Sequence, residues 1–224
     1  MRLMGMLLGA LLSWTPMAQA QTLVVVELFQ SQGCSSCPPA IANLNAIADR
    51  AGVLALNFSV TYWDNLGWKD TFASAAFTNR QYDYAHGLGH ANVATPEIVI
   101  NGRTDLVGAD RAALERALQQ NPPATASLSL HADFVAIGAA AARKGDVWLV
   151  RYDPRPRAVS IRAGENGGKT IIHRNIVREL TNLGAWSGAA QSYKLPPARE
   201  SGLKSAILVQ APRGGAIIAA ASDG

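Results

Sequence analysis

The amino-acid sequence predicts an α/β fold followed by a smaller β-rich part, and three observations support this fold class. Residues 23–60 show a strand–helix–strand pattern, with apolar strands typical of a sheet buried on both faces. The only two cysteines, Cys34 and Cys37, lie between the first strand and the helix. After a Pro-Pro pair, the pattern changes to short strands separated by turn residues. We therefore predict an α/β domain over residues 21–121 and a smaller, sandwich-like β domain over residues 126–224.

The first strand, helix and second strand are predicted from local patterns. Residues 23–29 form a nearly continuous apolar run that contains three consecutive β-branched valines, which predicts a buried strand. Residues 39–50 have apolar positions at helical spacing, and Gly52 is placed to end that helix. Residues 53–60 predict a second strand, and the connecting helix is long enough to let the two strands pair in parallel.

The next elements follow an aromatic loop over residues 62–70. Asp70 or Thr71 can cap a helix over residues 72–86. After Pro96, the predicted elements are a strand over 97–101, a tight turn at Gly102-Arg103, a strand over 104–107 and a helix over 111–119 capped by Asp110. The resulting order, β-α-β-α-β-β-α, is that of thioredoxin-like domains.

The second domain is predicted to consist of strands. Residues 121–125 form the linker candidate, because two prolines stop the preceding helix. Residues 164–170 resemble a phosphate-binding loop, but the first glycine is misplaced and a strand follows, so we interpret them as a hairpin turn. Short strands with turn signals predict a small antiparallel sandwich. The strand patterns lie at 127–136, 147–152, 158–163, 170–180, 205–211 and 216–220.

The composition favours a folded chain without a nucleic-acid partner. Hydrophobic residues make up 49% of the 224 residues and charged residues 16%, so a sizeable core can form. The formal net charge is +4, and it falls to +3 when Arg2 is removed with the N-terminal segment. Lysine and arginine form no cluster of the kind that binds polyanions.

Residues 1–20 have the features of a secretory signal peptide. Arg2 supplies a positive start, residues 3–14 are apolar but short for a bilayer span, and Ala18-Gln19-Ala20 is a cleavage motif. We expect a mature chain that begins at Gln21, is periplasmic or secreted, and has no membrane span. In such an oxidising compartment, a lone pair of cysteines is expected to form a disulfide at rest.

The Cys34-Ser35-Ser36-Cys37 motif predicts thiol chemistry. Only a thiolate attacks a disulfide, and N–H groups at a helix start can stabilise one, so Cys34 is the predicted nucleophile. Cys37 is the predicted resolving thiol. Pro38-Pro39 disfavours helical backbone at Cys37, which favours an entry turn at this residue. An inert structural disulfide and soft-metal binding by the two thiolates remain alternatives.

Other candidate site residues lie on three segments. Thr95-Pro96 precedes an apolar strand and is a candidate cis bond; in thioredoxin-like folds this proline faces the cysteines and the preceding backbone binds substrate. Trp63 can form a wall of the site or stack on a peptide. Glu27 lies in an apolar strand, where burial raises a carboxyl pKa, and is a candidate proton relay to Cys37. The alternatives are a trans proline, a packing tryptophan and a glutamate that reaches water.

No metal site is predicted from the histidines. His86 and His90 are four residues apart, as in helical metal sites, but Gly87 and Gly89 lie between them and favour a loop.

Four sequence blocks are similar to those of a known family. They are residues 26–39 around the cysteines, residues 62–70, Thr95-Pro96 with Asn101-Gly102, and residues 173–177. With these blocks the chain resembles a secreted bacterial thioredoxin-like family, the domain of unknown function 1223. The resemblance covers nearly the whole mature chain and implies a thioredoxin-like domain with an appended β domain. It implies no demonstrated reaction.

The leading hypothesis is an exported thiol–disulfide oxidoreductase that acts on protein or peptide thiols and exchanges electrons with a redox partner protein. Cys34 attacks, Cys37 resolves, and Thr95 with Pro96 and Trp63 binds substrate. This chemistry requires no organic cofactor. One alternative is a Cu(I)-binding metallochaperone, disfavoured because all four methionines lie in the predicted signal peptide. The other is a non-catalytic interaction protein with a structural disulfide.

Overall fold

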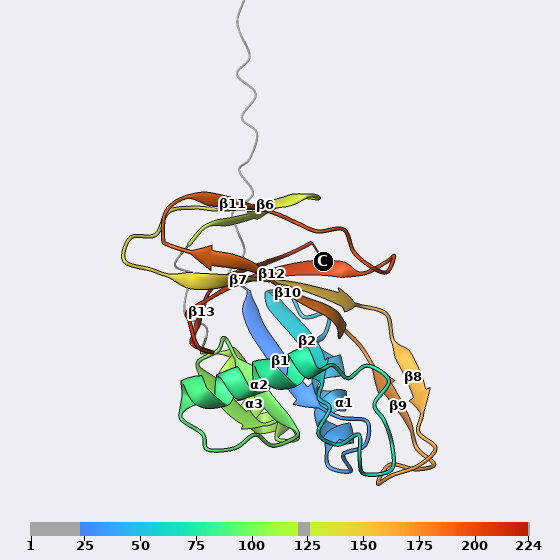
Figure 1. Cartoon of the computed structure of the whole chain (residues 1–224). Coiled ribbons are helices and arrows are strands. Elements are labelled where there is room, and N and C mark those ends of the chain that lie inside the picture. Colours follow the sequence, from blue (N-terminus) through green and yellow to red (C-terminus); the bar gives the residue numbers. More distant parts are fainter. Residues whose placement is uncertain (1–22, 121–125, 224) are drawn as a thin grey trace, which may run out of the picture.

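A computed structural model describes residues 23–120 and 126–223. The signal peptide predicted over residues 1–20 and the linker predicted over residues 121–125 lie outside the described residues. The described part has a mixed α/β fold, with one large mixed sheet and two small antiparallel sheets (Figure 1).

The first part of the chain contains strands and helices in the predicted order β-α-β-α-β-β-α. The cap predicted for the last helix is confirmed, because the Asp110 side chain accepts a hydrogen bond from the Ala113 N–H at 2.9 Å. The cap predicted for the second helix is wrong: Ser74 caps it, and neither Asp70 nor Thr71 does. The elements are β1 (Val24–Gln30), α1 (Cys37–Ile47), β2 (Val53–Ser59), α2 (Ala75–Leu88), β3 (Glu97–Ile100), β4 (Thr104–Val107) and α3 (Arg111–Leu118).

The second part contains strands, as predicted, although two of them are divided. Residues 127–136 form a hairpin. The sequence does not reveal its turn, because the alternation of apolar residues continues through it. Residues 170–180 are divided at Asn175, where φ is +49°. The strand β11 was not predicted. The elements are β5 (Leu128–Leu130), β6 (Phe134–Ile137), β7 (Gly145–Asp153), β8 (Arg157–Ser160), β9 (Thr170–His173), β10 (Ile176–Trp186), β11 (Gln191–Lys194), β12 (Lys204–Gln210) and β13 (Ile217–Ser222).

The large sheet contains strands from both parts of the chain. Its order is β13-β12-β7-β10-β2-β1-β3-β4. β1 pairs in parallel with β2 and antiparallel with β3. β10 joins β2 in parallel at the Ile176–Asn57 pair, and the Asn57 N–H donates to the Asn175 carbonyl at 2.9 Å. The predicted boundary at residues 121–126 therefore does not separate two sheets, since β10 extends the sheet that β2 belongs to.

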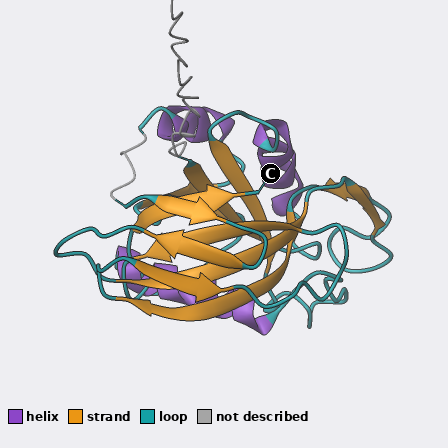
Figure 2. Cartoon of the chain, turned by 90° about the horizontal axis from the view of Figure 1, so that it is seen from above, coloured by secondary structure: helices purple, strands orange, loops and turns teal. Residues whose placement is uncertain are grey.

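Both faces of the large sheet are covered, and Figure 2 shows helices on both sides of the strands. On one face, Phe29 of β1 packs against Tyr84 of α2 with ring centroids 5.9 Å apart. On the other face, Leu28 lies in a buried cluster with residues of α1 and α3. The small sheet β11-β6-β5 packs against the β7 and β12 side chains that point away from α2. None of the helices in the described ranges is sufficiently long and apolar to cross a membrane.

Candidate functional site

Cys34 and Cys37 form a disulfide in the turn that connects β1 to α1. Their Cα atoms are 5.4 Å apart, and the Cys37 N–H donates to the Cys34 carbonyl at 3.2 Å. Cys37 is the first residue of α1, so it lies at the helix start and not in a separate entry turn. Both side chains are fully buried, and they pack in the cluster that contains Leu28 and Leu44.

The start of α1 offers few N–H groups to a charged sulfur. Helix starts normally present unpaired N–H groups that stabilise anions. In α1 two of the first residues, Pro38 and Pro39, have no N–H, and that of Cys37 is already used. The nearest side-chain partner is Ser36, whose Oγ lies 3.3 Å from Sγ of Cys34. The anion-stabilising environment expected at Cys34 is therefore weaker than in a typical helix start.

The residues predicted to bind substrate lie next to Cys34. The Thr95–Pro96 bond is cis, as predicted. The Thr95 carbonyl oxygen is 4.0 Å from Sγ of Cys34. Trp63 donates from Nε1 to Oγ1 of Thr95 at 2.8 Å and packs against the cluster that contains both cysteines. The structure therefore brings Cys34, Cys37, Thr95 and Trp63 together.

Gln32, which sequence reasoning missed, joins the cysteine turn to the loop that precedes α2. Its side chain is fully buried. Its Oε1 accepts from Nε1 of Trp68 at 2.9 Å, and its Nε2 donates to Oγ1 of Thr71 at 3.0 Å. Its backbone N–H donates to Asp70 at 2.7 Å. A polar residue in the short segment between an apolar strand and the cysteines was the only sequence signal for this role.

Asp70 holds the same loop. Besides the Gln32 N–H, it accepts from the Phe72 N–H at 2.8 Å. Burial raises the pKa of Asp70 to about 6, against the lowering effect of these hydrogen bonds. Asp70 therefore fixes the loop between β2 and α2 and does not cap the helix.

The turn between β8 and β9 covers the cysteine turn from the other part of the chain. Asn166 is fully buried and donates to the carbonyls of Gln32 and Cys34 at 2.9 and 2.7 Å. Glu165 accepts from the Ser35 N–H at 3.0 Å. The hairpin turn predicted for this segment is confirmed. Its contact with the cysteines was not predicted.

Glu27 is the predicted catalytic residue that the structure does not bring to the cysteines. Val26 and Leu28 point toward Cys34 and Cys37, so Glu27, between them in β1, points to the opposite face. There it forms a buried ion pair with Arg80 of α2 at 2.7 Å. The proton-relay hypothesis for Glu27 is corrected accordingly, because the sheet lies between this carboxylate and the disulfide.

A family model described as "Protein of unknown function (DUF1223)" matches residues 25–210. The chain belongs to the DUF1223 family. No curated protein matches it.

Two solved structures are similar to this DUF1223 protein. The crystal structure of protein AGR_C_4864 from Agrobacterium tumefaciens is 33% identical, with a TM-score of 0.75, over 92% of this chain and 95% of that chain. HBP35 of Porphyromonas gingivalis is 12% identical, with a TM-score of 0.60, over 92% of this chain and 76% of that chain. The second likeness concerns the fold alone.

The histidines of the DUF1223 protein do not assemble a metal site. Across the described residues, no group of three or more His, Cys, Asp or Glu side chains is arranged to hold a metal ion. His86 and Gly87 belong to α2, which corrects the predicted loop. His90 lies beyond the helix and hydrogen-bonds to Asp105 at 3.1 Å. His173 is fully buried, and burial lowers its pKa to about 4.

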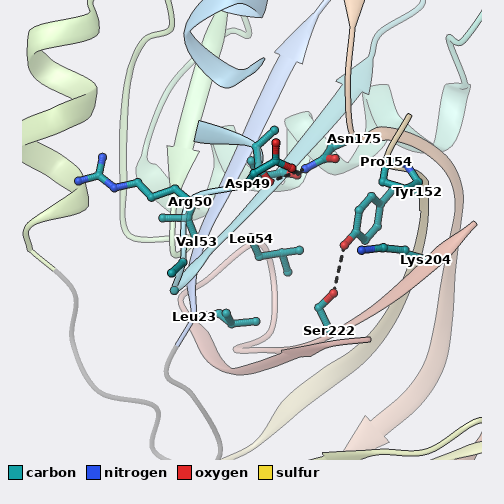
Figure 3. Close-up of a pocket in the computed structure, with 14 residues that line it drawn as sticks. Leu23, Asp49, Arg50, Val53, Leu54, Tyr152, Pro154, Asn175, Lys204 and Ser222 are labelled. Atoms are coloured by element: carbon teal, nitrogen blue, oxygen red, sulfur yellow. Dashed lines mark hydrogen bonds between the residues drawn. The ribbon is translucent and has the colours of Figure 1, made fainter. Parts of the chain in front are cut away.

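A polar pocket of about 310 Å³ in the DUF1223 protein lies away from the cysteines (Figure 3). It is lined by Leu23 and Val53, where β1 and β2 begin, whereas the cysteine turn follows the end of β1. On its other side, the hydroxyls of Tyr152 and Ser222 are 3.1 Å apart. This pocket and the disulfide therefore occupy opposite ends of the strands.

Proposed function

We propose that this protein exchanges its Cys34–Cys37 disulfide with the thiols of a protein or peptide substrate. The observation that carries the proposal is the disulfide at the start of α1, with the carbonyl of Thr95, before the cis Pro96, 4.0 Å from Sγ of Cys34. The first part of the chain has the element order expected of a thioredoxin-like domain, which also supports disulfide exchange as the function.

The proposed exchange is a two-electron transfer in two steps. A substrate thiolate attacks Sγ of Cys34, so the bond to Cys37 breaks, a mixed disulfide forms and Cys37 leaves as a thiolate that takes up a proton. A second thiolate of the same substrate then attacks the substrate sulfur of the mixed disulfide, and Cys34 leaves as a thiolate. The substrate dithiol is oxidised and the cysteine pair is reduced. A disulfide of a partner protein takes up the two electrons by the reverse sequence.

Three residues are proposed to position the substrate. The backbone of Thr95, next to Pro96, binds an extended segment beside Cys34, and the indole of Trp63 packs against it. Trp63 is held for this task by its hydrogen bond to Thr95. Glu27 supports the fold instead of the chemistry. We also propose export to the periplasm or beyond, where a disulfide is the resting state.

Trapping tests the proposal directly. The chain from Gln21 is produced with Cys37→Ser, which leaves the nucleophile and removes the resolving thiol. We expect the Cys34 thiolate to attack disulfides of oxidised proteins, so that one partner sulfur leaves as a thiol and a mixed disulfide accumulates. Such mixed disulfides are resolved on non-reducing gels and released by dithiothreitol. The matched control is Cys34→Ser, which keeps one thiol but is expected to trap little. Equal trapping by the two variants would assign the reaction to a generally exposed thiol and overturn the assigned roles.

The reduction potential separates the proposal from its alternatives. Equilibration with glutathione buffers is expected to give a potential above about −230 mV, in the range of labile disulfides. A potential below about −300 mV, together with loss of folding stability in Cys34→Ser/Cys37→Ser, indicates a structural disulfide. Stoichiometric Cu(I) binding by the reduced pair, without trapping, supports the metallochaperone instead.

A further inference from the structure

The segment that resembled a phosphate-binding loop contacts the cysteine turn. This segment, residues 164–169 between β8 and β9, reaches it from more than 120 residues away in the sequence. Both contacts are polar and directional: Asn166 donates to two carbonyls of the turn, and Glu165 accepts from the N–H of Ser35. Lys169 donates to Oδ1 of Asn166 at 2.8 Å, which orients the amide so that its N–H groups face the turn.

The same segment also meets the aromatic loop. The backbones of Gly67 and Gly164 approach so closely that a Cβ on Gly67 would lie 3.3 Å from Cα and N of Gly164. A Cβ on Gly164 would lie 3.2 Å from the Leu66 carbonyl oxygen and from Cβ of Trp68. The two loops that border the cysteine turn are therefore in contact with each other, and both cysteine side chains beneath the turn are fully buried.

The Glu165 contact has an electrostatic consequence for the reduced protein. Reduction adds two electrons and breaks the S–S bond, so that each sulfur becomes either a thiol or a thiolate. A thiolate on Cys34 needs nearby N–H donors, yet the Ser35 N–H is engaged by Glu165 and the Cys37 N–H by a carbonyl. A carboxylate next to Cys34 also opposes a second negative charge.

We propose that Glu165 and Asn166 are positioning residues of the cysteine site: Asn166 clamps the turn that carries Cys34, and the Glu165 carboxylate disfavours the Cys34 thiolate. This inference rests on the proposed function for its purpose. The effects it predicts, on the Cys34 thiolate and on the cysteine turn, are properties of the cysteine pair and can be measured without a substrate. The negative charge of Glu165 makes the disulfide harder to reduce than it is without that charge, because it destabilises the thiolate of the reduced pair.

The test for Glu165 uses the reduced chain from Gln21 and needs no substrate. The variant is Glu165→Gln, and the control is Asp133→Asn, which removes the same charge from the exposed turn between β5 and β6. Thiolate absorbance titrated against pH is expected to show a lower Cys34 pKa in Glu165→Gln. The equilibrium constant with glutathione is expected to change about threefold to tenfold toward the reduced pair, or about 15–30 mV.

Ionic strength supplies an independent signature. Glu165 is exposed, so raising salt from about 0.05 to 1 M shortens the screening length and should shrink the difference between wild type and Glu165→Gln. A Glu165→Gln shift no larger than that of Asp133→Asn would overturn the electrostatic role. A shift without any trapping by Cys37→Ser would sustain this inference while the proposed function fails.

The test for Asn166 measures access to the disulfide. Asn166→Ala removes both hydrogen bonds to the turn, so reduction by dithiothreitol is expected to be at least several-fold faster than in wild type. Lys169→Met is the milder partner variant, since it keeps the amide and removes only the group that orients it. It should fold and show a smaller acceleration. Unchanged reduction rates in both variants would refute the clamp.

Discussion

Glu27 and Arg80 form a buried, two-pronged ion pair on the face of the sheet opposite the disulfide. Nε and Nη2 of Arg80 donate to the two carboxylate oxygens at 2.7 and 3.2 Å. Arg80 also donates to Gln210 of β12 at 3.1 Å and lies 5.6 Å from the ring centre of Trp148 in β7. A single arginine of α2 therefore connects β1 with strands of the second part of the chain.

The first prediction concerns the stability that this pair provides. Arg80→Met is expected to lower the free energy of unfolding by about 3–5 kcal/mol, because it leaves the Glu27 carboxylate buried without a positive charge, with the Tyr84 hydroxyl still donating to it. Arg50→Met, which removes a surface partner of Glu115, is the control and should cost about 0–1 kcal/mol. Urea denaturation followed by far-UV circular dichroism measures both. Similar losses in the two variants would contradict the assignment.

The second prediction separates a structural from a catalytic Glu27. Glu27→Gln is expected to reduce stability, because the charge-assisted bonds to Arg80 are lost. It should leave the pH profile of disulfide reduction unchanged, since the side chain faces away from the cysteines. Rates of reaction with dithiothreitol between about pH 6 and 9 provide the measurement. A displaced pH profile in a variant that is still folded would restore the proton relay.

The third prediction concerns the contact between the two loops. Gly164→Ala is expected to separate the turn between β8 and β9 from the aromatic loop, and to speed reduction of the disulfide several-fold. The reason is that φ at Gly164 is +70° and an added Cβ would meet Leu66 and Trp68. Gly168→Ala is the matched control: φ is +84° in the same turn, but a Cβ there meets nothing within 4 Å. Both pay the roughly 1–2 kcal/mol of a left-handed alanine. Equal rates in the two variants would show that the contact does not restrict access.

What the sequence could predict was local. The β1–α1–β2 pattern and the cap at Asp110 depend on residue types within a few positions, and both are present in the structure. The cis bond at Pro96 is also present, but its prediction depended in addition on the cysteine pair far upstream and the thioredoxin-like element order. Glu27 shows where this fails. Both faces of β1 are apolar, so the sequence does not say which face the cysteine turn lies on, and Arg80 carries no signal of its inward position.

The cover of the disulfide depends on contacts that are remote in sequence. Asn166 lies 132 residues after Cys34, and its hairpin lies directly before β10, the strand that pairs with β2. A separate second domain was predicted because Pro-Pro and a change in strand pattern mark a boundary. Neither feature indicates that β10 pairs with the edge of β2.

The fourth prediction concerns Asp70 and pH. Burial raises the pKa of Asp70 to about 6, from 3.8. Between these values the folded protein holds a proton that the unfolded chain has lost, so this stabilisation is present below about pH 4 and is lost as pH rises through 6. It is on the order of 2–3 kcal/mol. Asp70→Asn should remove this contribution, so its stability relative to wild type should fall steadily from pH 6 to 4.

The fifth prediction concerns His173, whose ring packs edge-on against Phe72, the residue whose N–H donates to Asp70. Burial lowers the pKa of His173 from 6.5 to about 4. Between these values the unfolded chain takes up a proton that the folded protein refuses, so stability is present above about pH 6.5 and is lost as pH falls to 4. This slope opposes that of Asp70.

The two groups therefore largely cancel in the wild type between pH 4 and 6, and single variants should expose each slope. Asp70→Asn should lose stability toward acid, because His173 then acts alone. His173→Phe keeps a ring against Phe72 and should gain stability toward acid, because Asp70 then acts alone. In the double variant, neither residue 70 nor residue 173 titrates in this range, so this site should add little to the change of stability with pH. The measurement is the urea midpoint of wild type and of each variant at pH 4, 5, 6 and 7. Parallel plots of midpoint against pH for the two single variants would show that neither group titrates as its burial requires.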